Sequence, residues 1–194
     1  MFVAGSLNSK IFVNRLAWNK EDKVKLTSTL IGHKGAIRTV NFLSESILLS
    51  GATDASVGLW DLNSPQKPLA MLQGHMSDIL TSEVSKVDRN VFLTGSSDLT
   101  IKIWDIRLKN PQVYNFTGPQ SSVTTVKFAP NSLSTFAAGS DDSFIRLFDL
   151  RMGKEIHRYQ DPNSHNPIRS IEFSKSGRLI FGATSSHTLK VWDT

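Results

Sequence analysis

The chain has 194 residues, no cysteine and a formal net charge of +5. The lack of cysteine excludes disulfides, cysteine-ligated zinc and a cysteine nucleophile. The basic residues are scattered without a basic block, so binding of nucleic acid is not expected. No apolar run approaches the roughly 20 residues needed to cross a bilayer, and neither a membrane span nor a signal peptide is expected.

An aromatic residue followed by aspartate recurs along the chain at a fixed interval. The four pairs are 44 residues apart: Trp60-Asp61, Trp104-Asp105, Phe148-Asp149 and Trp192-Asp193. Self-similarity at such a period indicates an array of one supersecondary unit. Between the pairs lie short β-prone segments separated by turn residues, with no long run at helical period. The sequence therefore predicts an all-β chain.

The units are expected to form one array over residues 1–194. A partial unit at 1–31 is followed by units at 32–73, 74–117, 118–160 and 161–194, the last incomplete. Strands are expected at 10–13, 23–31, 37–42, 47–50, 57–60, 69–72, 79–84, 91–94, 100–104, 113–116, 123–128, 136–138, 144–148, 155–159, 168–173, 179–181 and 188–192. Gly51 and Gly95 are expected to open turns. Four short strands per unit are typical of an antiparallel propeller blade.

A histidine, a hydroxyl, an aspartate and a tryptophan recur at matching offsets in the two best-formed units. These sets are His33, Ser50, Asp54 and Trp60, and His75, Thr94, Asp98 and Trp104. The first three residue types are also those of a nucleophilic triad. However, the set occurs twice, whereas an enzyme needs one site, and buried indole, imidazole and hydroxyl groups each need a partner. We therefore expect structural hydrogen bonds and no catalysis.

The third unit departs from this pattern. Pro119, Ala138 and Phe148 replace the histidine, the hydroxyl and the tryptophan. The neighbouring carboxylates Asp141 and Asp142 suggest acid–base chemistry or a metal, but Asp142 matches the aspartates of the other units. It is therefore assigned the structural role, which leaves Asp141 free at the surface. No metal site, cofactor or nucleotide-binding loop is expected, and residues 174–178 are interpreted as a polar hairpin turn.

Two levels of resemblance to known proteins follow from these residues. The segments from Gly32-His33 to Trp60-Asp61 and from Gly74-His75 to Trp104-Asp105 resemble WD40 repeats. Residues 74–79, 138–151 and 173–180 are similar to the β subunits of heterotrimeric G proteins. That family forms a seven-bladed propeller, so the resemblance implies a partial WD40 propeller of about four repeats plus part of another, from a truncated or partial chain.

The resemblance also implies a function and a site. It implies a non-catalytic subunit that binds the GDP-bound α subunit and a γ subunit and passes receptor signals to effectors. The location implied is the cytoplasm, at the inner face of the plasma membrane through partner subunits. Leu7, Asp78 and Asp141 match α-contact positions of the family, whereas Ala36 and Ser122 replace an aromatic residue and an aspartate. The alternatives are a generic WD40 scaffold in another complex and a non-functional truncated product.

Overall fold

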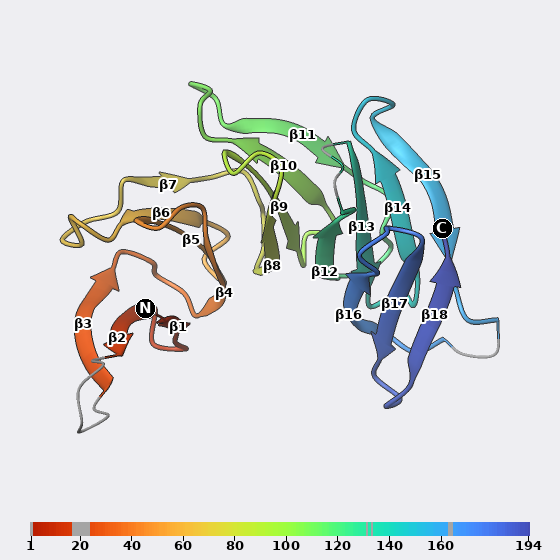
Figure 1. The fold of residues 1–194 in the computed structure, drawn as a ribbon, viewed down its shortest axis with the longest axis horizontal. Coiled ribbons are helices and arrows are strands. Elements are labelled where there is room, and N and C mark those ends of the chain that lie inside the picture. Colours follow the sequence, from red (N-terminus) through yellow and green to blue (C-terminus); the bar gives the residue numbers. More distant parts are fainter. Residues whose placement is uncertain (1, 17–23, 131, 133, 163–164) are drawn as a thin grey trace.

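The protein is an open arc of five antiparallel sheets. The computed structural model describes residues 2–16, 24–130, 132, 134–162 and 165–194. Over this part of the chain it has 18 strands and no helix, and therefore no helix that could cross a membrane. Figure 1 shows the sheets following one another along the arc, with the two termini in the sheets at its opposite ends. The predicted all-β array of blades is confirmed.

The three central sheets are complete four-stranded meanders. Their strands are β4 (Ile37–Phe42), β5 (Ile47–Ala52), β6 (Val57–Asp61) and β7 (Ala70–Leu72); β8 (Ile79–Val84), β9 (Val91–Ser96), β10 (Ile101–Asp105) and β11 (Gln112–Phe116); and β12 (Val123–Phe128), β13 (Thr135–Ser140), β14 (Ile145–Asp149) and β15 (Lys154–Tyr159). Within each sheet, strands that are consecutive in the chain are hydrogen-bonded neighbours. The first strand of each sheet packs against the first strand of the next sheet, so β4, β8 and β12 form the inner side of the arc.

The two end sheets have three strands each among the described residues. They are β1 (Phe2–Gly5), β2 (Lys10–Leu16) and β3 (Val24–Ile31), and β16 (Ile168–Phe173), β17 (Leu179–Thr184) and β18 (Leu189–Asp193). Residue 23, the predicted start of β3, lies outside the described residues. Since β1 packs against β4, and β16 against β12, the first sheet corresponds to the second to fourth strands of a complete blade. The last sheet corresponds to the first three.

A repeated contact between a glycine and a β-branched residue joins the blades. A Cβ atom at Gly51, Gly95 or Gly139 would lie 2.6 Å from a terminal carbon of Ile79, Val123 or Ile168, respectively. Each of these side chains is buried at the start of the next inner strand. The three glycines lie within β5, β9 and β13, where the lack of a side chain makes room for the β-branched residue of the next sheet. The prediction that Gly51 and Gly95 open turns is therefore wrong; their role is close packing between sheets.

The third blade keeps its aromatic core although it has lost the tryptophan. Phe136 and Phe148 face each other across β13 and β14 and stack with centroids 4.9 Å apart. In the preceding blade, Phe92 and Trp104 stack in the same register at 6.0 Å. Phe116 from the neighbouring blade packs edge-on against Phe148 at 5.4 Å. The change to phenylalanine thus removes a hydrogen-bond donor but preserves the stacked pair.

Candidate protein-binding face

In the second unit, four side chains form one continuous buried chain of hydrogen bonds. Trp104 Nε1 donates to Thr94 Oγ1 at 2.8 Å, and His75 Nε2 lies 2.7 Å from the same hydroxyl. His75 Nδ1 is 2.8 Å from Asp98 Oδ2. The set is fully paired if the hydroxyl donates to Nε2 and the Nδ1 hydrogen faces the carboxylate, and we assign that tautomer.

The first unit repeats this arrangement. Trp60 Nε1 donates to Ser50 Oγ at 2.8 Å, and His33 Nε2 lies 2.7 Å from that hydroxyl. His33 Nδ1 is 3.0 Å from Asp54 Oδ2. Both central hydroxyls, on Ser50 and Thr94, are completely buried, so neither can reach a substrate. The structure therefore brings together both predicted sets in a geometry suited to holding a blade.

The aspartates of these sets also hold the turn between the second and third strands. Asp98 accepts hydrogen bonds from the backbone N–H groups of Met76 and Thr100, at 2.9 and 3.0 Å. Between the aspartate and Thr100 lies Leu99, with a φ of 69°. A left-handed conformation costs a non-glycine residue roughly 1–2 kcal/mol. The carboxylate offsets that cost and ties the turn to the loop that carries His75.

Hydrogen bonding and burial move the pKa values of these groups in defined directions. Burial of Asp54 would raise its pKa, but hydrogen bonds from Ser56, the Lys34 backbone and His33 together outweigh burial and lower the pKa to about 2. Burial lowers the pKa of His75, against the opposing hydrogen bond and charge of Asp98. The geometry thus favours a neutral imidazole beside an ionised carboxylate.

The lowered pKa of Asp54 predicts a pH-dependent contribution to stability. A depressed carboxylate pKa stabilises the folded state above the unfolded pKa of 3.8, and this contribution is lost as pH falls toward the folded pKa of about 2. Asp54→Asn should therefore be less stable than wild type at neutral pH, and the difference should shrink as pH falls from about 5 to about 2. Urea unfolding of both proteins across this range checks it; a difference that stays constant with pH would contradict the assignment.

In the third unit, an arginine takes the place of the missing histidine. Arg146 is 1% exposed and contacts Asp142 through both terminal nitrogens: Nη1 donates to Oδ1 at 3.0 Å, and Nη2 lies 2.8 Å from Oδ2. Asp142 still accepts backbone N–H groups of Gln120 and Phe144, at 2.7 and 3.1 Å. Asp142 thus holds its turn as Asp54 and Asp98 do. Sequence reasoning missed Arg146, although a charged residue between Ile145 and Leu147 in a buried strand was a usable signal.

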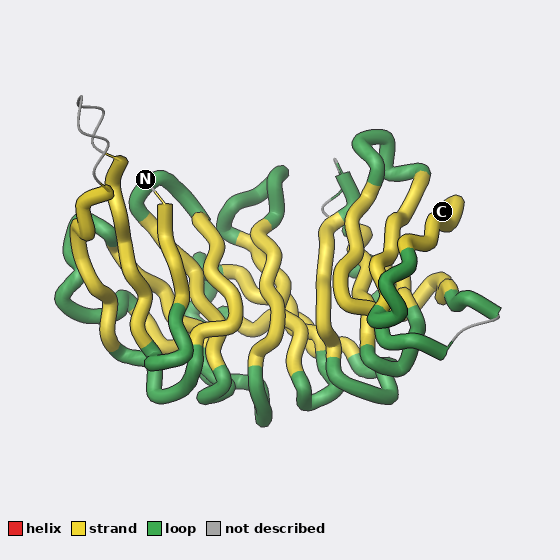
Figure 2. The backbone as a smooth tube through the Cα atoms, turned by 90° about the horizontal axis from the view of Figure 1, so that it is seen from below, coloured by secondary structure: helices red, strands yellow, loops and turns green. Residues whose placement is uncertain are grey.

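The three residues expected to contact a partner lie on one face of the arc. Leu7 and Asp141 occupy equivalent positions in the β1–β2 and β13–β14 turns, each two residues before a residue with positive φ. Asp78 immediately precedes β8, and its carbonyl accepts the N–H of Ser97 from the β9–β10 turn at 2.9 Å. The turns on this side and those on the opposite side form the two edges of the arc in Figure 2. Leu7, Asp78 and Asp141 thus lie beside strands of three different sheets and share one edge of the arc.

The expectation that Asp141 is free at the surface is wrong. Arg169 Nη1, from the start of β16 in the next sheet, donates to Asp141 Oδ1 at 2.8 Å. The aspartate side chain is 30% exposed and the arginine 54% exposed. Asp141 therefore remains reachable from solvent, but a partner would meet an ion pair rather than a lone carboxylate. Among the described residues, no group of three or more histidine, aspartate and glutamate side chains is placed to hold a metal ion.

Comparison with known proteins agrees with this architecture. Residues 33–194 match the family model of a β-propeller described as "Nucleolar protein 10-like, N-terminal domain". The chain is 43% identical over 191 residues, or 98% of its length, to the guanine nucleotide-binding protein subunit beta of Schizosaccharomyces pombe, and it spans 60% of that protein. A 71-residue segment, 36% of the chain, is 32% identical to Restriction of telomere capping protein 1 of Clavispora lusitaniae and covers 5% of that protein. The chain belongs to the WD40-type β-propeller family represented by the Nucleolar protein 10-like N-terminal domain, and it is similar to a G-protein β subunit, as its residues predicted.

Proposed function

We propose that the chain is a non-catalytic protein-binding subunit that holds a GDP-bound G-protein α subunit on the face carrying Leu7, Asp78 and Asp141. The observation that carries the proposal is the common placement of these positions. They are separated widely in sequence, yet they lie on turns at the same edge of the arc. The 43% identity to a guanine nucleotide-binding protein subunit beta supports the same partner class.

The face that carries Leu7, Asp78 and Asp141 combines exposed apolar side chains, carboxylates and a fixed backbone, as a protein-binding surface does. Leu7 is 78% exposed and Met76, two residues before Asp78, is 93% exposed, so this edge presents exposed apolar side chains as well as carboxylates. The backbone beneath them is fixed: the N–H of Met76 is held by Asp98, and the N–H of Asp141 donates to the Ser122 carbonyl at 3.0 Å. A fixed backbone reduces the entropy lost on association.

The ion pair between Asp141 and Arg169 must be exchanged before the Asp141 carboxylate can bind a partner. Half-exposed ion pairs contribute about 0–1 kcal/mol, so the pair can be exchanged at small cost for one with a basic side chain of the α subunit. In this proposal Asp141 changes partner on binding, while Asp78 offers its carboxylate directly.

The experiment is capture of a purified GDP-loaded α subunit by the chain. Asp78→Ala combined with Asp141→Ala should weaken capture about tenfold or more, since hydrogen bonds to charged groups are each worth about 1.5–3 kcal/mol. The matched control, Glu45→Ala with Asp61→Ala, removes two carboxylates from the opposite face. Both residues lie there because the Leu62 N–H, next to Asp61, donates to the carbonyl of Ser46, next to Glu45. If the first pair of changes leaves capture as strong as the control does, these residues are not the contact.

The remaining partners and the location belong to the same proposal. A γ subunit and effectors would be further partners, and the chain would reach the inner face of the plasma membrane from the cytoplasm through them. A scaffold role in another assembly is the second candidate, and the match of residues 33–194 to the Nucleolar protein 10-like domain favours it. If the folded chain captures no GDP-loaded α subunit, the scaffold role in another assembly is favoured.

A further inference from the structure

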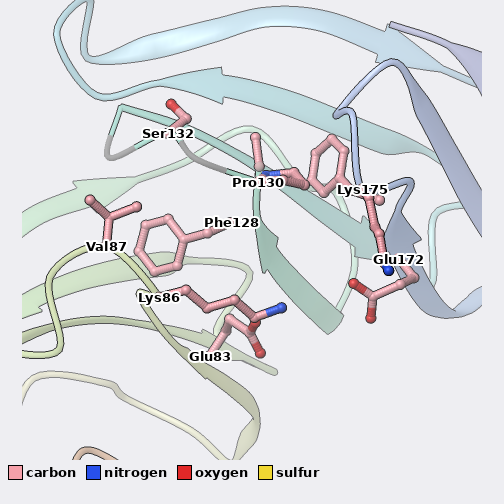
Figure 3. Close-up of a pocket in the computed structure, with 10 residues that line it drawn as sticks. Glu83, Lys86, Val87, Phe128, Pro130, Ser132, Glu172 and Lys175 are labelled. Carbon is pink, nitrogen blue, oxygen red and sulfur yellow. The ribbon is translucent and has the colours of Figure 1, made fainter.

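A cavity of about 280 Å³ lies on the face opposite Asp78 and Asp141. It is formed by the turns that follow β8, β12 and β16, so three successive blades contribute to it. Figure 3 shows Val87 beside the ring of Phe128 on one side, with Pro130 between them and Lys175. Val87 is 54% exposed, and the Phe128 and Pro130 side chains are partly exposed. Val87, Phe128 and Pro130 thus give the cavity an apolar part that is open to solvent, within a lining that also contains charged side chains.

The two carboxylates that line the cavity, on Glu83 and Glu172, are already engaged. Lys127 Nζ lies 3.2 Å from Glu83 Oε2 and 3.2 Å from Glu172 Oε2. The three residues come from adjacent inner strands, β8, β12 and β16. Burial raises the pKa of Glu83, with the charge and hydrogen bond of Lys127 opposing it. These carboxylates therefore serve to join neighbouring blades.

The mouth of the cavity is positively charged. Lys86 and Lys175 stand on the β8–β9 and β16–β17 turns and line the cavity, and Arg89 follows on the first of these turns. All three are exposed, and none forms an ion pair with a residue in the described part of the chain. Two arginines on this face are paired, Arg107 with Asp88 and Asp105 and Arg178 with Asp193, whereas Lys67 and Lys109 on neighbouring turns are also exposed and form no ion pair within the described part of the chain. Lys127 is shared between Glu83 and Glu172, and the charge of Lys86 also acts on Glu83, so Lys86, Lys175 and Arg89 leave a modest net positive charge at the mouth.

We propose that this cavity binds a short acidic peptide segment of a partner protein, which inserts an apolar side chain beside Val87 and Phe128 and places carboxylates on Lys86 and Lys175. The volume admits one large aliphatic or aromatic side chain and does not admit a folded domain. The flanking ammonium groups discriminate against basic segments by charge. The site lies on the opposite edge from the proposed α-subunit contact, so both can be occupied together.

The test uses the full chain, tethered at low density, and two labelled hexapeptides. One has two central leucines flanked on each side by two glutamates; the other has lysines in place of the glutamates. The acidic peptide should bind saturably and more weakly at higher salt, and the basic peptide should not bind. Lys86→Glu with Lys175→Glu should weaken binding of the acidic peptide by about tenfold or more.

Two further variants separate the cavity from general electrostatics. Lys67→Glu with Lys109→Glu makes the same change in charge at exposed lysines outside the cavity and should leave binding unchanged. Val87→Asp changes an exposed wall residue and should abolish binding while the thermal midpoint stays near that of wild type. The proposal would be overturned if both double lysine variants lost the same amount of acidic-peptide binding, or if wild type bound the two peptides equally or did not bind the acidic one. Full binding of the acidic peptide by Val87→Asp would also overturn it.

Discussion

Asp142→Ala should lower the free energy of unfolding by about 3–5 kcal/mol, because it leaves a buried guanidinium without its carboxylate. Arg146 is 1% exposed, and both of its terminal nitrogens contact Asp142. Its Nε lies 3.3 Å from Glu155 Oε2, but the geometry is not that of a hydrogen bond. Glu155 therefore still provides a counter-charge near Nε, but it does not provide the hydrogen bond and the close pairing that Asp142 gives the terminal nitrogens. Urea unfolding followed by tryptophan fluorescence measures the change.

The adjacent aspartate supplies a matched control for this prediction. Asp141→Ala removes the same side chain one residue away, but its pair with Arg169 is at the surface, so the cost should be under about 1 kcal/mol. Replacing Asp142 and Arg146 together by leucine should cost less than Asp142→Ala alone, since no buried charge remains. Similar losses for Asp141→Ala and Asp142→Ala would show that the buried pair does not hold the third blade.

Thr94→Val should lower the free energy of unfolding by about 1–3 kcal/mol for each buried polar group that it leaves unpaired. The substitution keeps the shape of the side chain and removes the hydroxyl that joins Trp104 Nε1 to His75 Nε2. Both ring nitrogens then remain buried without that partner. Thermal or urea unfolding of the variant measures the loss.

A double-mutant cycle tests the origin of this loss. Trp104→Phe removes the indole donor, so Thr94→Val combined with Trp104→Phe should cost less than the sum of the two single changes. The third blade already has an apolar pair at these positions, Ala138 and Phe148, and it keeps a stacked aromatic core. Strictly additive losses would mean that the hydroxyl and the indole contribute independently.

Much of the fold follows from features that repeat in the sequence. The interval between the aromatic–aspartate pairs predicts the blades, and matching offsets predict that His75, Thr94 and Trp104 come together. Local patterns also fix the turn at residues 174–178, where the Gly177 N–H donates to the Ser174 carbonyl at 2.9 Å. Such features can be recognised in the sequence because the same residue types recur at the same positions in several units.

Contacts between blades could not be read in the same way. Arg169 reaches Asp141 from the next sheet, and nothing in the local sequence states which way either side chain points. Gly95 looks like the start of a turn until Val123 from the next blade is placed against it. The cavity beside Phe128 arises only where three turns converge, although each turn alone reads as an ordinary polar connection.

The most direct test of the proposed function is hydrogen–deuterium exchange of the chain with and without a GDP-loaded α subunit. Exchange should slow on the face of Leu7, Asp78 and Asp141, in the β1–β2 and β13–β14 turns and in the loop before β8. The turns that surround Lys86 and Lys175 on the opposite face should keep their rates. Protection confined to those opposite turns, or no protection at saturating α subunit, would contradict binding of the α subunit on the face of Leu7, Asp78 and Asp141.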